Sequence, residues 1–216
     1  MAAVPELVQL AVAFPSPHPL TSSRFEKTVR RRGTEFNTTT AVRPNGGQVP
    51  VLVASSKQAL ILYDPTNGNF SFQVHQFKAL QSTVRPIISK LCRAAGFVES
   101  KIRWWELQSV FVFDSEATAL RRLHRSIGEP PTWTKDILGI EMAQWGLRVI
   151  PSSADGWSRP FNELIPWTEV TIEPLSANPS KIYMRFVFRE STWSRLGPKA
   201  SRLPALAERL LRRMNK

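Results

Sequence analysis

Cysteine, histidine and long apolar runs are all scarce in this chain of 216 residues. Cys92 is the only cysteine, so no disulfide can form within the chain. It lies at the edge of an apolar helical stripe, where we expect a buried, inert thiol rather than a nucleophile. The 3 histidines are scattered and show no metal-site spacing, so we expect neither a metal nor another cofactor.

The sequence contains no run of about 18 apolar residues, which argues against a membrane-spanning helix. Its N-terminal segment lacks the basic start of a signal peptide and carries Glu6 inside an apolar run, as a first strand would. We therefore expect an intracellular protein of the cytoplasm or of the nucleoid or nucleus.

Catalytic signatures are also missing. Asn67-Gly68-Asn69 is a turn rather than a phosphate loop, because no Lys-Ser/Thr pair opens a helix after it. We expect a protein that is not an enzyme, and an active site assembled across the two halves of the chain is the least favoured hypothesis.

Basic residues, in contrast, are abundant. The formal net charge is +12 and the sequence pI is about 10.7. Such a surface attracts polyanions or acidic proteins over distances set by salt. The alternative is that the charge serves only solubility.

The first half of the chain predicts a strand, a helix, several strands and a second helix. A capping-box spacing at Ser23 and Glu26 predicts a helix from about Arg24 to Arg32, stopped by Gly33. Apolar residues at helical spacing predict the second helix over Lys78 to Ala95, with Gly96 as the residue after its end. The strand-like runs are 6–14, 36–42, 49–55, 59–63 and 70–74.

The second half repeats this order. It predicts a strand over 101–113, a helix over 116–127, a hairpin over 169–190 and a terminal helix over 202–214. The sequence thus favours an internally duplicated α+β protein with repeats 1–98 and 99–216, the second carrying an insert at 128–167. A duplicated β-α-β(n)-α unit would form an antiparallel sheet with helices packed on one face.

This order of elements is similar to the saddle of the TATA-box-binding protein family, whose repeats also run strand, helix, strands, helix. The resemblance covers most of the chain and rests on element order. It implies a saddle-like sheet with pseudo-twofold symmetry. The insert at 128–167 departs from the compact repeat of that family, and no residue pair here matches its intercalating phenylalanines.

The hairpin over 169–190 separates a core face from a charged face. A turn near Ala177 would place Glu173 opposite Lys181, Thr171 opposite Tyr183 and Glu169 opposite Arg185. Exposed pairs of this kind are common, and one interpretation of the charged face is a simple solvated ladder. Arg189 then has no acid opposite it, which predicts that it is available to a partner.

Other basic residues cluster near predicted helix ends, where the helix dipole alone favours cations. If they share a rim, they would form patches that contact phosphates, with Tyr183 as an aromatic face for a base. The predicted nucleic-acid-binding residues are Arg30, Arg31, Arg32, Arg121, Arg122, Arg125, Lys181, Tyr183, Arg185, Arg189, Arg209, Arg212 and Arg213.

The insert is rich in tryptophan and proline. Trp133 and Trp157 have prolines and few aliphatic residues near them and are predicted to be exposed, whereas Trp145 and Trp167 are predicted to be core residues. The insert then serves either as a cover on the sheet or as a site for a protein partner.

The leading hypothesis is a protein that binds DNA or RNA mainly through phosphates. The alternative is a structural or adaptor subunit that docks onto a protein through Trp133 and Trp157.

Overall fold

A computed structural model describes residues 3–17, 20–42, 46–114, 146–150 and 165–214. The chain divides into two compact units. The first consists of 7–108 and 188–201, and the second consists of 1–6, 109–187 and 202–216. We call them the N-unit and the C-unit and describe each by itself.

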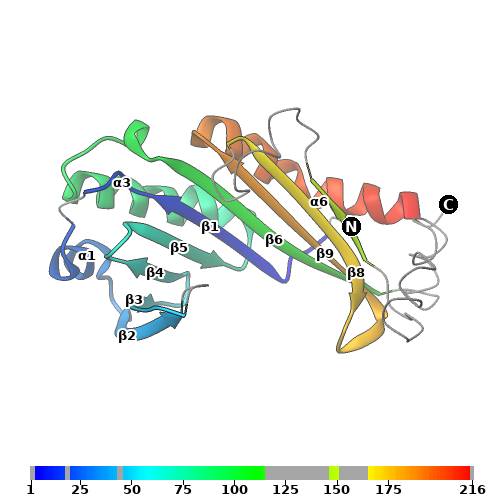
Figure 1. Cartoon of the computed structure of the whole chain (residues 1–216), viewed down its shortest axis with the longest axis horizontal. Coiled ribbons are helices and arrows are strands. Elements are labelled where there is room, and N and C mark those ends of the chain that lie inside the picture. The colour runs from blue at the N-terminus through cyan, green and yellow to red at the C-terminus, as the bar shows by residue number, and fades with distance from the viewer. Residues whose placement is uncertain (1–2, 18–19, 43–45, 115–145, 151–164, 215–216) are drawn as a thin grey trace. The chain divides into compact units, whose positions relative to one another are not determined.

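The chain has the predicted α+β class, with one large antiparallel sheet and a few helices (Figure 1). Nine strands follow the order β2-β3-β4-β5-β1-β6-β9-β8-β7. They are β1 Leu7–Ala13, β2 Glu35–Val42, β3 Gln48–Ser55, β4 Leu60–Asp64, β5 Asn69–Val74, β6 Trp104–Asp114, β7 Leu147–Val149, β8 Trp167–Leu175 and β9 Asn178–Glu190. The internal duplication, with its boundary at 98/99, stays a prediction.

The core of the N-unit is built on strands that alternate between buried and half-buried residues, as period-two sequences do. Phe14, Phe25, Tyr63 and Phe70 form a buried aromatic cluster, in which the Tyr63 and Phe70 rings stack at 4.3 Å. The buried Tyr63 hydroxyl donates to the carbonyl oxygen of Leu20 at 2.7 Å, so its polar end is satisfied.

Helix α1 (Ser22–Val29) confirms the predicted helix but has different ends. Its N-cap is Thr21, whose side chain accepts from the Arg24 amide at 3.3 Å, so the capping box at Ser23 is wrong. The helix ends before the three arginines, with Arg30 as its C-cap.

The helix predicted over Lys78 to Ala95, which we call the midpoint helix, is one run of three pieces, α2 (Phe77–Ala79), η1 (Leu80–Val84) and α3 (Arg85–Ala94). The middle piece is a π-helical turn in which the Arg85 amide bonds the Leu80 carbonyl. Pro86 lacks an amide hydrogen, so the regular ladder is interrupted at this point, where a π turn accommodates the break.

The predicted apolar stripe of this helix is confirmed, since all six of its members are buried: Leu80, Val84, Ile87, Ile88, Leu91 and Ala95. Gly96 ends the helix at φ +77°, and the Phe97 and Gly96 amides donate to the Cys92 and Arg93 carbonyls. Cys92 is buried as predicted, and burial raises the pKa of its thiol to about 12, with a further contribution from Glu99. The thiol is therefore protonated at neutral pH.

After the short helix η2 (Glu99–Lys101), strand β6 begins at Trp104, later than predicted. In the C-unit, β6 continues through the buried residues Ser109, Val110 and Phe111. Phe111 packs edge-on against Phe186 of β9, with ring centres 5.8 Å apart. Ile182, Met184 and Phe186 are buried, as the predicted core face of the hairpin requires.

Helix α6 extends from Trp193 to Met214, so the prediction of a start at Arg202 is wrong. Pro198 and Pro204 interrupt the helical pattern in the sequence, because proline lacks the amide hydrogen of the ladder. Leu196, Ala200 and Leu203 are nevertheless buried, and their packing outweighs the poor local propensity. No helix of the described residues is long and apolar enough to cross a membrane.

Candidate nucleic-acid interface

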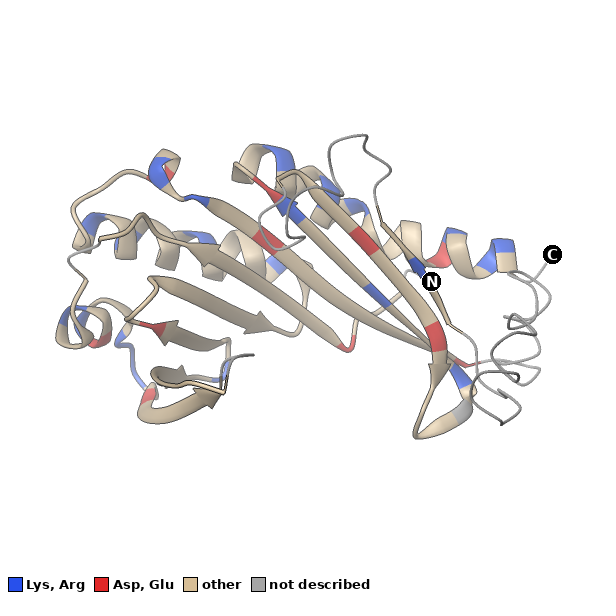
Figure 2. Ribbon diagram, in the orientation of Figure 1, with Lys and Arg blue, Asp and Glu red and all other residues tan. Residues whose placement is uncertain are grey.

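The basic residues of the described chain lie mainly on helices and the segments beside them, with a smaller set on strands such as β9 (Figure 2). Arg121, Arg122 and Arg125, together with their predicted helix over 116–127, lie outside the described residues. Whether they form a phosphate-contacting patch together with the cluster at 30–32 therefore stays untested.

In the N-unit, Arg30, Arg31 and Arg32 follow α1 in a tight loop. The Arg31 amide donates to Thr34 Oγ1 at 3.1 Å, and the Thr34 amide donates to the Arg31 carbonyl at 3.0 Å. Gly33, at φ +77°, supplies the left-handed conformation that this turn needs. The backbone of the cluster is thus fixed locally while its side chains point into solvent.

The three side chains differ in their contacts. The Arg30 guanidinium lies 4.7 Å from the Phe36 ring centre and 3.6 Å from the Glu26 carboxylate, in an exposed pair. Arg31 and Arg32 are exposed and form no ion pair with any residue that the structure describes. These two are therefore the strongest candidates of the N-unit for contacts with phosphate.

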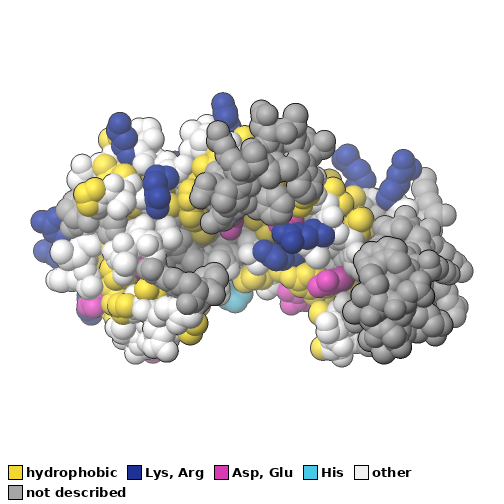
Figure 3. Space-filling view, viewed as in Figure 1, with side chains coloured by type: hydrophobic (Ala, Val, Ile, Leu, Met, Phe, Trp, Pro, Cys, Tyr) yellow, Lys and Arg dark blue, Asp and Glu magenta, His cyan; other side chains and the backbone are white. Residues whose placement is uncertain are grey.

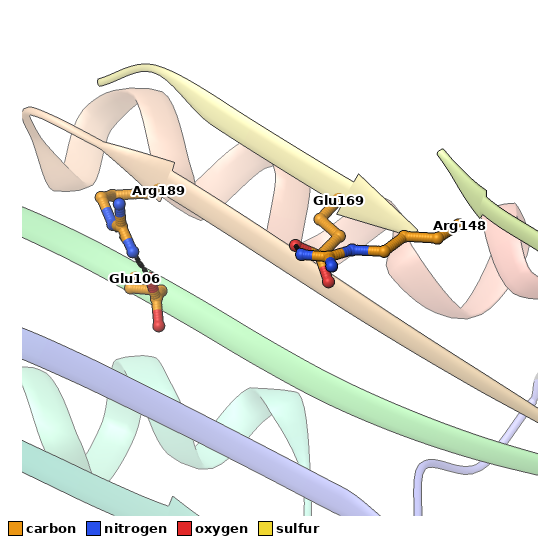
Figure 4. Close-up of polar contacts among 4 residues, drawn as sticks. All are labelled: Glu106, Arg148, Glu169 and Arg189. Carbon is orange, nitrogen blue, oxygen red and sulfur yellow. Dashed lines mark hydrogen bonds and ion pairs between the residues drawn. The ribbon is translucent and has the colours of Figure 1, made fainter. Parts of the chain in front are cut away.

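Arg189, also in the N-unit, is bound by an acid, which corrects the prediction that it has none. Its Nε donates to Glu106 Oε2 at 2.9 Å, and its Nη2 also donates to this oxygen (Figure 4). The guanidinium also lies 5.6 Å from the Trp104 ring centre. With side-chain exposures of 12% for Arg189 and 21% for Glu106, the pair is largely screened from solvent.

In the C-unit, Lys181, Tyr183 and Arg185 share one face of β9 and are half-buried, as the alternation predicts. The predicted partners are wrong, because Lys181 pairs with Asp114 at 3.5 Å rather than with Glu173. Burial raises the pKa of Tyr183 above its ordinary value, while Arg185 lowers it in part and Glu173 raises it. The phenol is therefore neutral and can donate a hydrogen bond at neutral pH.

Glu169 pairs with Arg148 of β7 instead of Arg185, with Arg148 Nη2 and Glu169 Oε2 2.8 Å apart (Figure 4). The Glu169 side chain is only 9% exposed, so at this residue the charged face differs from the solvated ladder that one interpretation of the sequence gives. Arg185 is left without this acid, and its buried Nε has no hydrogen-bond partner.

The end of α6, also in the C-unit, exposes Arg209, Arg212 and Arg213. Arg212 pairs with Glu208 one turn earlier, at 3.4 Å. Arg209 and Arg213 form no ion pair with a described residue. Cations in the last turn also complement the helix dipole, so this cluster has a structural role as well.

Figure 3 shows Lys and Arg side chains that stand out on the surface of the part of the chain that the structure describes. Separate exposed cations suit an extended polyanion, because each can contact a different charge along its backbone. A small anion would instead need several cations converging on one point.

The sequence interpretation missed Asp114 as the partner of Lys181, Glu106 as the partner of Arg189, and Arg148 as the partner of Glu169. Arg148 lies in Leu147–Val149, a strand-like run that the sequence does show, and its pairing with β8 places Arg148 opposite Thr171. The pairing of Glu106 with Arg189 spans 83 residues and becomes visible only when the strand order places β6 beside β9.

Trp133, Trp145 and Trp157 lie outside the described residues. Trp167 is buried at 5% exposure, as predicted. The adaptor hypothesis, which depends on Trp133 and Trp157, therefore stays a prediction.

No protein-family model and no curated protein matches this chain. Among solved structures, the chain is similar to the TBP of Methanococcus jannaschii, with 9% sequence identity over 100% of this chain and 99% of that one. The TM-score is 0.42. A likeness of this size defines neither the fold nor the function, which rest on the residues of the chain itself.

Proposed function

We propose that this protein binds nucleic acid, DNA or RNA, mainly through phosphate contacts from exposed arginines. The observation that supports this is the presence of exposed arginines with no acidic partner among the described residues. Among the residues that the sequence predicts as nucleic-acid contacts, they are Arg31 and Arg32 in the N-unit and Arg209 and Arg213 in the C-unit.

Among the predicted nucleic-acid-binding residues that the structure describes, exposure and the lack of an ion pair separate these four from Arg30, Arg189 and Arg212. An arginine that is already bound by a carboxylate must break that pair before it can bind phosphate, and Arg189 would also lose contacts with Glu106 and Trp104. An exposed arginine without an acid loses only its solvent and counterions. The proposal therefore includes Arg31, Arg32, Arg209 and Arg213 and leaves out Arg189.

The second group, on β9, supplies different chemistry. Arg185 is half-buried and forms no ion pair with a described residue, and the neutral Tyr183 combines a donor with an aromatic face. Such a pair suits a phosphate beside a base, since aromatic faces stack on bases of any sequence. We expect it to contribute to single-stranded more than to double-stranded ligands.

The test is the fluorescence anisotropy of labelled duplex DNA, single-stranded DNA and single-stranded RNA, titrated with protein between 50 and 300 mM salt, a range of roughly sixfold. We expect log affinity to fall linearly with log salt. The double variant Arg31→Ala/Arg32→Ala should lower the magnitude of that slope by about one to two units, with similar losses for all duplex sequences.

The matched control is Arg195→Ala/Arg202→Ala, which removes the same charge from exposed positions of α6. If the control lowers the slope as much as the test pair does, net charge alone explains the binding and the proposed contacts are wrong. Binding that does not depend on salt would refute the phosphate mechanism for every residue named above.

A further inference from the structure

The N-unit contains an open, mostly apolar pocket of about 660 Å³ between two helical segments. One wall comes from α2 and η1, and the other comes from the first turns of α6. A volume of this size is within the range of small-molecule sites, roughly 300–1,000 Å³. We call it the α2–α6 pocket.

The first wall is shaped by the π turn. Leu80 is buried and Phe77 is half-buried, which makes this wall apolar, while Lys78 and Gln81 are exposed at its rim. The turn is followed by Pro86, which has no amide hydrogen to donate to the ladder of hydrogen bonds. Single π turns inside α-helices occur frequently at functional sites, so the wall has a form that is uncommon in helices with only a packing role.

The second wall is built around Trp193 and Gly197. A Cβ atom at Gly197 would lie 3.2 Å from Nε1 and 3.3 Å from Cε2 of the Trp193 indole, so the ring lies directly against the helix backbone. On the same ring, the Arg85 guanidinium lies 5.1 Å from the centre and Trp105 lies 5.7 Å away. Glycine inside a helix costs about 1 kcal/mol relative to alanine, and here it allows the indole to form the wall.

The charge that lines the pocket is positive. Among the described residues that line the pocket, Lys78 is the only charged one, and none is Asp or Glu. Lys78 is exposed and forms no ion pair with any part of the chain that the structure describes. A ligand that fills the apolar walls would therefore meet a cation at the rim, which favours an anionic headgroup and disfavours a cationic one.

We propose that the α2–α6 pocket binds small amphiphilic anions, with an aliphatic or aromatic body between Leu80 and Trp193 and an acidic headgroup at Lys78. This site is independent of the proposed nucleic-acid contacts. The body is held by burial of apolar surface, and the headgroup sets the preference among ligands of equal apolar size.

The test uses 1-anilinonaphthalene-8-sulfonate, whose fluorescence rises on transfer to an apolar site. The probe is displaced by dodecanoate or by dodecyltrimethylammonium, both kept below micelle formation. We expect dodecanoate to displace the probe at a concentration at least about tenfold lower, which corresponds to about 1.4 kcal/mol. The variant Lys78→Gln should remove most of this difference, whereas Lys90→Gln, at an exposed lysine of α3 outside the pocket, should retain it.

A second variant tests the location. Ser201→Trp places a large ring at the exposed mouth of the pocket and should abolish binding of both probe and dodecanoate, while Ser23→Trp on α1 should have no effect. Gly197→Ala, which displaces the indole, should also weaken binding. It replaces Ser201→Trp as the test of location if that variant does not fold. Equal behaviour of the two lysine variants would overturn the headgroup assignment, and undiminished binding by a folded Ser201→Trp protein would overturn the site.

Discussion

At the scale of single residues, the basic side chains are of two kinds, and net charge does not distinguish them. Arg189 and Arg148 each neutralise a shielded carboxylate, of Glu106 and Glu169, and hold neighbouring strands together. Removing one member of such a pair leaves the other charge poorly solvated, which costs more than the pair itself contributes. These arginines are parts of the fold, whereas Arg31 and Arg32 are free to act on a ligand.

This distinction gives a stability prediction for Glu106 and Arg189. Glu106→Ala should lower the free energy of unfolding by about 2–3 kcal/mol, because the guanidinium stays shielded without its acid. Replacing both residues, as Glu106→Leu/Arg189→Met, should recover most of this loss. Urea unfolding of the two variants and the wild type measures both values.

The same variants test the role of Arg189 in binding. The double variant should bind nucleic acid with a salt slope close to that of the wild type. A slope reduced by about one unit would show that Arg189 does contact phosphate, as the sequence pattern predicts.

At the scale of elements, the sequence correctly predicted the bounds of a helix where its local sequence signals agree with its packing. The midpoint helix has an apolar stripe whose residues are all buried and a glycine at its end, so pattern and fold agree. Helix α6 begins earlier than predicted because Pro198 and Pro204 signal a break that burial of Leu196 and Ala200 overrides. The acids that bind the basic residues could not be predicted, since a partner on a distant strand leaves no local pattern.

The N-terminus of helix α1 gives a direct test of a local sequence signal. Thr21→Ala should lower the free energy of unfolding by about 0.5–1 kcal/mol, because the Arg24 amide loses its acceptor. Ser23→Ala should change it by less than about 0.3 kcal/mol, since serine and alanine differ little at a position inside the first turn. Thermal unfolding of the two variants shows whether Thr21 or Ser23 caps the helix. A larger loss of unfolding free energy for Ser23→Ala would favour the capping box.

At the scale of the whole molecule, a net charge of +12 favours the binding of polyanions, and this binding is thermodynamically linked to folding. A ligand that binds only the folded state stabilises it by an amount that grows with the logarithm of its concentration. The unfolded chain has the same net charge, however, so a gain in stability requires the cations to be held in a particular arrangement.

This argument gives a prediction for thermal stability. Duplex DNA at about 100 times its dissociation constant should stabilise the protein by about 2.7 kcal/mol, seen as a rise in melting temperature. The rise should disappear in high salt and shrink in the Arg31→Ala/Arg32→Ala variant. A melting temperature that stays constant, or falls, on addition of DNA would indicate that the unfolded chain binds at least as well.

Strand β2 affects how the protein behaves in concentrated solution. It lies at one end of the strand order and pairs only with β3, from Glu35 opposite Ser55 to Val42 opposite Gln48 without a skipped residue. Its eight residues include neither lysine nor proline, the usual guards of an exposed edge against pairing with another chain. At low salt the positive charge keeps molecules apart, but in 1 M salt the screening length falls to about 3 Å. The high salt that strips nucleic acid from the protein should therefore also favour its aggregation through this edge.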